Sequence, residues 1–357
     1  MILQKSGDTS SADASNFYGQ NAALVVQNGA ANVQNLTVET DAEGANAVFA
    51  TGEQSRIAIE GVTIRTQKDS SRGLDATYGG TIVAQNVDIT TQGAHSAALA
   101  TDRGEGKVTV TNGTLRTTGD GSPCIYSTGT ITANHITGSA AGSQCAVVEG
   151  KNSIVLQSST LSGAGENGVM LYQSTSGDAA EGTAVFTAWQ STLRTTSDGP
   201  MFYVTNTHAE MTLQQTELSF DSGVLVRVSG NSTNQWGTPG QNGGQLVLNA
   251  TSQTLVGDLV VDEISTLQVN LQSDSMLTGA VNAAYSGKEV NLNPAETAVW
   301  KVTEDSYLTV LTNALSDCTN IQSNGHNVYY DATHAGNAWL NGSTIILPGG
   351  GLLRPIA

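Results

Sequence analysis

The stretch GSPCIYSTGTITANHITGSAA, residues 121–141, is followed directly by GSQCAVVEGKNSIVLQSSTLS, residues 142–162. Both stretches begin with Gly-Ser-x-Cys, and 21 positions separate Cys124 from Cys145. In each stretch the cysteine opens a short apolar run, and an alternating polar and apolar run follows after a glycine, as in consecutive β-strands. Two adjacent units of the same length and pattern indicate a structural repeat rather than a redox or metal motif.

The apolar run recurs along most of the chain, at intervals of about 21 to 32 residues. Its copies are AALVV (22–26), NAVFA (46–50), GLDAT (73–77), AALAT (97–101), PCIYS (123–127), CAVVE (145–149), GVMLY (168–172), PMFYV (200–204) and GVLVR (223–227). Between copies lie two more short strands, such as KVTVT at 107–111 and NGTLRT at 112–117. Three strands per repeat predict coils stacked about 4.8 Å apart around a shared core. The predicted fold is all-β, a right-handed parallel β-helix.

We expect one continuous solenoid with four segments. Residues 1–16 are a flexible leader or the N-terminal edge, and 17–228 are β-helix coils. Residues 229–244 form a Gly/Asn-rich loop, and 245–357 continue the coils and end in a C-terminal cap. The longest interval between coils contains the insertion QSTSGDAAEG at 173–182. Trp236 in the Gly/Asn-rich loop is either a platform for a sugar or a lid over the edge of the core.

The composition narrows the possible partners. The chain has 31 acidic and 14 basic residues, a formal net charge of −17. A field of this sign repels nucleic acid, and no stretch reaches the roughly 18 apolar residues of a membrane span. We expect a monomer without a cofactor. The N-terminal MILQKSGDTSSADASNF lacks the apolar core of a signal peptide, so any signal or anchor is expected outside this sequence.

Several segments carry a family resemblance. GVMLYQSTSGDAAEGTAVF (168–186), SDGPMFYVTNTHAEMTL (197–213) and TLRTTGDGSPCIYSTGTI (114–131) are similar to β-helical, adhesin-like regions of large secreted or wall-anchored proteins of Gram-positive, often gut-dwelling, bacteria. The likeness covers roughly residues 6–330. A more distant likeness is to pectate-lyase-like β-helices, which include carbohydrate-binding members. The resemblance implies a secreted or cell-surface module for adhesion or ligand presentation, and it transfers no catalytic motif.

A strip beside the apolar runs is the candidate site. Aromatic, acidic and amide side chains follow these runs in successive coils, and rings that stack on sugars beside groups that bind hydroxyls suit a glycan. A solvated strand edge would show the same residue types. The predicted ligand-binding residues are Tyr78, Asp102, Tyr126, Glu149, Tyr172, Tyr203, Asn206 and Trp236.

Two other functions stay open. Asp102 and Glu149 are two coils apart, about 10 Å by strand spacing, which is within reach of an inverting carboxylate pair. With Arg103 as a base, this favours a polysaccharide lyase or glycoside hydrolase of the pectate-lyase-like fold. The third reading is a passive stalk. No metal site is expected, because the histidines lack the spacing of a ligand set.

Polar and thiol side chains are also predicted to stack from coil to coil. Cys124 and Cys145 should be reduced and point inward, with Ala98 and Val169 as neighbours in the same column. Two further ladders are expected: asparagines at turns, and threonines that either stabilise the coils or form an exposed, ice-ordering rank. They are Asn35, Asn86, Asn112 and Asn134, and Thr40, Thr66, Thr91, Thr117 and Thr195.

Overall fold

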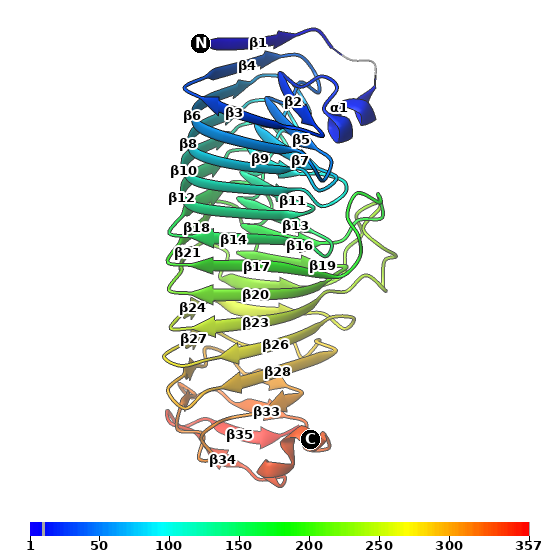
Figure 1. Cartoon of the computed structure of the whole chain (residues 1–357). Coiled ribbons are helices and arrows are strands. Elements are labelled where there is room, and N and C mark those ends of the chain that lie inside the picture. The colour runs from blue at the N-terminus through cyan, green and yellow to red at the C-terminus, as the bar shows by residue number, and fades with distance from the viewer. Residues whose placement is uncertain (9–10, 357) are drawn as a thin grey trace.

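The computed structural model describes residues 1–8 and 11–356 and confirms the predicted all-β, parallel solenoid. About 13 turns of about 25 residues stack along one axis, and 4% of the chain is helical. Figure 1 shows the N-terminus at one end of the stack and the C-terminus at the other. Among the described strands every pairing is parallel except that between β34 (Ile345–Ile346) and β35 (Leu352–Pro355) in the last turn.

The largest sheet has 17 strands and wraps around a corner of the solenoid. Its longest members have 11 residues each and continue through that corner. The strands are β1 (Ile2–Ser6), β3 (Ala30–Gln34), β4 (Thr37–Asp41), β6 (Arg56–Thr66), β8 (Thr81–Thr91), β10 (Lys107–Thr117), β12 (Thr130–Ala140), β14 (Ser153–Gln157), β15 (Thr160–Gly163), β17 (Thr183–Trp189), β18 (Thr192–Thr195), β20 (His208–Gln214), β21 (Glu217–Ser219), β23 (Gln245–Thr251), β26 (Thr266–Leu271), β28 (Glu289–Pro294) and β31 (Val310–Leu311).

A ten-stranded sheet forms another face of the solenoid, and its first nine strands are the apolar runs of the sequence repeat. They are β2 (Leu24–Gln27), β5 (Val48–Thr51), β7 (Leu74–Thr77), β9 (Leu99–Thr101), β11 (Ile125–Ser127), β13 (Ala146–Glu149), β16 (Val169–Tyr172), β19 (Phe202–Thr205), β22 (Val224–Val228) and β25 (Asp258–Val261). Because side chains alternate between the faces of a strand, every second residue points away from the core.

Two four-stranded sheets and two short helices complete the structure. One sheet is β24 (Thr254–Val256), β27 (Met276–Thr278), β29 (Val299–Lys301) and β32 (Ile321–Gln322). The other is β30 (Ser306–Leu308), β33 (Val328–Tyr330), β34 and β35. The α-helix α1 (Ala12–Tyr18) lies near the N-terminal end, and the 3-10 helix η1 (Ala335–Leu340) lies in the last turns.

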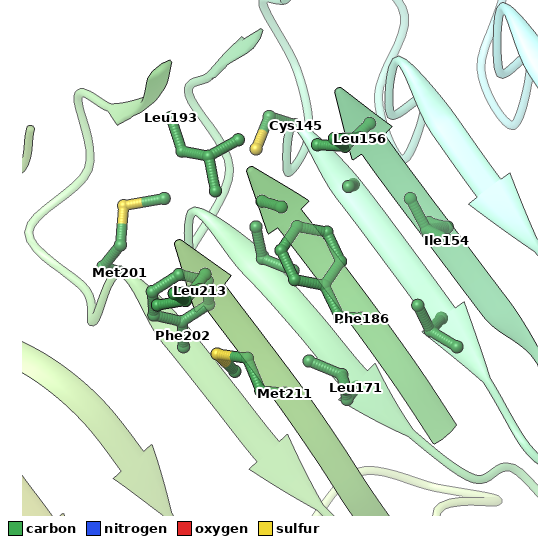
Figure 2. Close-up of a cluster of buried hydrophobic side chains, with 14 of the residues drawn as sticks. Cys145, Ile154, Leu156, Leu171, Phe186, Leu193, Met201, Phe202, Met211 and Leu213 are labelled. Atoms are coloured by element: carbon green, nitrogen blue, oxygen red, sulfur yellow. The ribbon is translucent and has the colours of Figure 1, made fainter. Parts of the chain in front are cut away.

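The core consists of inward columns of stacked apolar side chains. Leu99, Ile125 and Ala146 occupy equivalent positions on β9, β11 and β13 and are fully buried. Figure 2 shows such a cluster further along the axis, where the rings of Phe186 and Phe202 lie 6.2 Å apart. Strands about 4.8 Å apart bring equivalent residues into contact, so no coil needs to bury its own core alone.

The two cysteines of the opening repeat are adjacent in this core. Cys124 and Cys145 are both fully buried and free, as predicted. The neighbour of Cys145 in the next coil is Gly168 rather than the predicted Val169, because the register pairs Ala146 with Val169. Cys145 Sγ donates a hydrogen bond to the Gly168 carbonyl over 3.0 Å. Burial raises the pKa of Cys145 to about 12.

The polar ladders are structural. Asn86 and Asn112 adopt left-handed φ angles of 55° and 56° at the corner of the large sheet, a conformation that asparagine tolerates well. The Asn112 amide donates to Asn86 Oδ1 over 3.4 Å. In the next coil His135 occupies the corner position, with a φ of 54°. The predicted Asn134 lies one position before the corner, because Asn134 pairs with Thr111.

The threonine column points inward and is buried. Thr66, Thr91 and Thr117 are at most 1% exposed, and each hydroxyl donates to a backbone carbonyl five residues later. Such bonds satisfy the polar groups of a turn inside the stack. The expected structural role is confirmed for this column, and the alternative of an exposed, ice-ordering rank does not apply to it.

Candidate functional site

A cavity of about 530 Å³ lies over the outward face of the ten-stranded sheet. Figure 1 shows α1 and two long loops projecting from this same side of the solenoid. The loops are the insertion at 173–182 and the segment at 229–244. The cavity is lined by Asn16, Phe17, Ser70, Arg72, His95, Ala97, Asp102, Gly121, Pro123, Tyr126, Ser143, Gln144, Val147, Met170, Tyr172, Asp178 and Trp236.

Helix α1 forms the N-terminal wall. Ser11 caps its first turn, and Gly19 ends it with a φ of 64°. A Cβ on Gly19 would lie 2.5 Å from the ring of Phe49, so glycine lets the end of the helix sit directly on the sheet. The Phe17 carbonyl accepts a hydrogen bond from the Thr77 hydroxyl over 2.9 Å. The helix is therefore fixed to the outward face of β5 and β7, with Phe17 lining the cavity.

The two loops are tied to each other and to α1. Arg103 forms an ion pair with Asp178 of the insertion at 2.6 Å, and its guanidinium lies 3.8 Å from the centre of the Phe17 ring. The amide of Thr175 donates to the carbonyl of Gln235 over 2.7 Å, which joins the two loops. These contacts form a continuous rim from α1 through the insertion to the 229–244 loop.

Three aromatic rings form the other side of the cavity. The rings of Tyr172 and Trp236 lie 4.6 Å apart at an angle of 46°, so they make a corner. Tyr126 lies beside them, with its hydroxyl 3.4 Å from that of Tyr172. Both tyrosine hydroxyls donate to Glu149 Oε2, the Tyr172 bond measuring 2.9 Å. Since the hydroxyls are bound by Glu149, it is the rings that line the cavity.

Glu149 is a positioning residue rather than a residue of the cavity wall. It is 1% exposed, and its second oxygen accepts hydrogen bonds from the amide and the hydroxyl of Ser174. Its carboxylate thus has four donors within the protein, two of them phenols. A buried carboxylate with its acceptor positions filled is not available to attack or protonate a substrate. It holds Tyr126 and Tyr172 in place.

A buried charge cluster lies at the opposite end. Arg72 Nη2 lies 2.9 Å from Asp102 Oδ2, and Arg72 Nε lies 3.8 Å from Asp75 Oδ2. The contact with Asp102 is an ion pair without hydrogen-bonding geometry, since among the described residues Asp102 Oδ2 accepts no hydrogen bond. Arg72 also donates to the side chain of Asn16 over 3.0 Å, linking the cluster to α1.

Burial controls the protonation of the two aspartates. It raises the pKa of Asp75 to about 8, although the nearby Arg72 opposes the shift. Burial also raises the pKa of Asp102, again against the attraction of Arg72. Neither oxygen of Asp75 has a hydrogen-bond partner among the described residues, which fits a protonated carboxyl group more closely than a buried charge.

The structure brings together half of the residues that the sequence singled out. Asp102, Tyr126, Tyr172 and Trp236 line the cavity. Asp102 and Glu149 lie in one column, because each directly follows a register partner of Ser127, Thr101 and Val148 respectively.

The other predicted residues stabilise the surroundings. Tyr78 stacks on Tyr18 with ring centres 5.4 Å apart, one position out of register with the column of Asp102. Tyr203 donates to the Gly230 carbonyl over 3.3 Å, and Asn206 donates to the Gln173 carbonyl over 2.7 Å. Tyr203 and Asn206 therefore hold the loops that enclose the cavity.

Sequence reasoning missed Arg72, Asp75 and Asp178. Asp75 had a recognisable signal, since it is a charged residue inside the apolar run GLDAT. Asp178 belongs to an insertion, whose position above the sheet follows no repeat. Within residues 1–8 and 11–356, no group of three or more His, Cys, Asp or Glu side chains is arranged to hold a metal ion.

Comparison of the chain with protein-family models, with curated protein sequences and with solved structures finds no significant match. The fold is a β-solenoid, in agreement with the expected pectate-lyase-like architecture at that coarse level. In the part of the chain that the structure describes, no helix is long and apolar enough to span a membrane.

Proposed function

We propose that the protein is a secreted or cell-surface β-helix module that binds glycans, for adhesion or for ligand presentation. The observation that carries this proposal is the cavity beside the Tyr172–Trp236 corner. Ring faces of Tyr and Trp stack on the apolar faces of sugars, while amide and carboxylate groups bind hydroxyls. Both kinds of polar group are present here, as Gln144 and Asp102 line the same cavity as the rings.

The size and charge of the site support a glycan segment. A volume of about 530 Å³ lies within the range of about 300–1,000 Å³ that is usual for ligand sites. The net charge of −17 disfavours polyanionic chains and nucleic acid. As partner we propose a neutral or cationic glycan, or another ligand on a host or neighbouring cell. The protein would bind it as a monomer at the cell exterior, without inserting into a membrane.

A glycan array of host mucin and plant polysaccharide probes tests the proposal, followed by calorimetry on each hit. Trp236→Ala should weaken binding by about tenfold or more, the loss of one stacked ring. Tyr285→Ala is the matched control, because Tyr285 is 55% exposed and lies outside the cavity. A blank array would overturn glycan binding and favour the passive stalk. Hits whose affinity is unchanged by Trp236→Ala would overturn this cavity as the binding site.

Hydrolysis or lyase chemistry is the second candidate, and the position of Asp102 in the cavity wall favours it. The predicted partners are less suitable, since Glu149 is enclosed by four donors and Arg103 is paired with Asp178. Asp178 is the second carboxylate of the cavity wall. Product release from an array hit that is lost in both Asp102→Asn and Asp178→Asn would support catalysis. Release that survives both substitutions would eliminate it at this site.

A further inference from the structure

Several buried polar atoms near this cavity lack a hydrogen bond. Among the described residues seven such side-chain atoms occur, and four belong to Asp75, Asp102 and Gln173. Of these three residues Asp102 lines the cavity, at 4% exposure. Its Oδ2 is buried 2.9 Å from Arg72 Nη2 and accepts no hydrogen bond from the described residues. A carboxylate in a cavity wall is matched by a ligand that donates hydrogen bonds or carries positive charge.

The charges around the cavity lead to the same ligand class. Two guanidinium groups and four carboxyl groups lie in its walls or directly behind them: Arg72, Arg103, Asp75, Asp102, Glu149 and Asp178. Arg103 is already paired with Asp178, and Arg72 is shared between two aspartates. Even with the carboxyl group of Asp75 protonated, three carboxylates oppose two cations. A positively charged group in the cavity would remove this excess.

The aromatic corner provides a surface for such a group. Ammonium groups bind over the faces of Trp and Tyr, and adjoining tilted rings allow contact with two faces at once. Tyr172 and Trp236 have this arrangement, at 46°, and Glu149 keeps the Tyr172 hydroxyl turned away. The rim already contains one contact of this kind, because the guanidinium of Arg103 lies 3.8 Å from the ring centre of Phe17.

We propose that the cavity recognises a glycan that carries ammonium groups, which contact the Tyr172–Trp236 corner and, at the opposite end of the cavity, the carboxylate of Asp102. This inference rests on the proposed glycan binding and names the chemistry of the ligand. An oligomer of amino sugars supplies both parts, rings to stack and charged donors for the Asp102 carboxylate. An N-acetylated sugar of the same length has the ring without the charge.

The test compares two tetrasaccharides with the same backbone. A β-1,4-linked glucosamine tetramer is titrated into the full chain, and the fully N-acetylated tetramer is its neutral counterpart. Salt at about 0.15 M screens non-specific attraction to the acidic surface. The glucosamine tetramer should bind at least about tenfold more tightly. Choline and its uncharged carbon analogue 3,3-dimethylbutan-1-ol repeat the comparison with the charge as the only difference, and choline should bind more tightly.

Variants localise the effect. Asp102→Asn and Trp236→Ala should each lower affinity for the glucosamine tetramer by about tenfold. Trp236 lies in a loop, so its variant tests the site even where the loss of Asp102 disturbs the fold. Glu210→Gln is the control, since it removes the same charge from a shallow hollow on the 17-stranded sheet. An equal loss with Glu210→Gln would show non-specific attraction and overturn the site.

The two proposals fail separately. Equal affinity for the charged and the neutral tetramer would overturn the ammonium group and leave glycan binding intact. A second result would have the same meaning: neither tetramer binds, and the array hits are all neutral glycans whose binding is weakened by Trp236→Ala. Binding of neither tetramer together with a blank array would overturn both proposals.

Discussion

The hydroxyl of Tyr172 on β16 donates a 2.9 Å hydrogen bond to Glu149 on β13, one coil earlier in the solenoid. The two residues occupy the same outward column, so the coil spacing itself brings them together. Tyr126, from the coil before β13, donates to the same oxygen. Three consecutive coils thus fix the orientation of the two rings that the proposed ligand contacts.

Glu149→Gln should therefore weaken ligand binding without direct contact to the ligand. A neutral amide accepts the phenol hydrogen bonds less strongly, and bonds to a charged group contribute about 1.5–3 kcal/mol each. We expect a loss of about tenfold or more in affinity, measured by calorimetry on an array hit. Glu263→Gln, at an exposed position in the turn after β25, is the control and should leave the affinity unchanged. Unchanged affinity in Glu149→Gln would contradict the positioning role.

Asp75→Asn should change how stability depends on pH. The pKa of this carboxyl is about 8 in the folded protein against 3.8 for the free group. Below about pH 4 the Asp75 carboxyl is protonated in both the folded and the unfolded state. Between about pH 4 and 8 it keeps its proton only in the folded state. The free energy of unfolding therefore falls as pH rises through this range, by up to about 1.4 kcal/mol per pH unit. Above about pH 8 the slope ends.

The measurement is urea unfolding at several pH values. The Asn variant keeps a neutral side chain of the same shape, so it should lose this slope and gain stability relative to the native chain as pH rises. Asp120→Asn, at an exposed turn, should leave the slope in place. Parallel pH profiles for the native chain and Asp75→Asn would show that Asp75 is ionised in the folded state.

Removal of the Arg103 side chain should loosen the rim of the cavity. Arg103→Ala eliminates both the ion pair with Asp178 and the contact with the Phe17 ring. The pair is partly exposed, so the global free energy of unfolding should change by less than about 1 kcal/mol. Amide hydrogen exchange should nevertheless rise within 173–182 and α1. Unchanged exchange in both segments would show that the rim does not depend on Arg103.

The sequence repeat was enough to predict the fold, because each coil reuses the same strands and turns. It also placed Asp102 and Glu149 in one column and Cys124 beside Cys145. It failed by one residue in places: Cys145 lies beside Gly168 rather than the predicted Val169, and Tyr78 lies one position beyond the column of Asp102. Much of the cavity wall comes from α1 and two non-repeating loops, and no periodic pattern places Asp178 in that wall.

The close stacking of turns predicts one sharp difference between two glycines. A Cβ on Gly119 would lie 1.8 Å from the carbonyl oxygen of Gly93 in the preceding coil, and backbone atoms there cannot move independently. A Cβ on Gly29 would meet nothing within 4 Å, and neither position has a left-handed φ. Gly119→Ala should therefore cost at least about 1–3 kcal/mol of unfolding free energy through overpacking. Gly29→Ala should be neutral or stabilise by up to about 1 kcal/mol, since it restricts the unfolded chain. Urea denaturation of both variants checks this, and equal stabilities would mean that successive turns are less closely stacked than the structure has them.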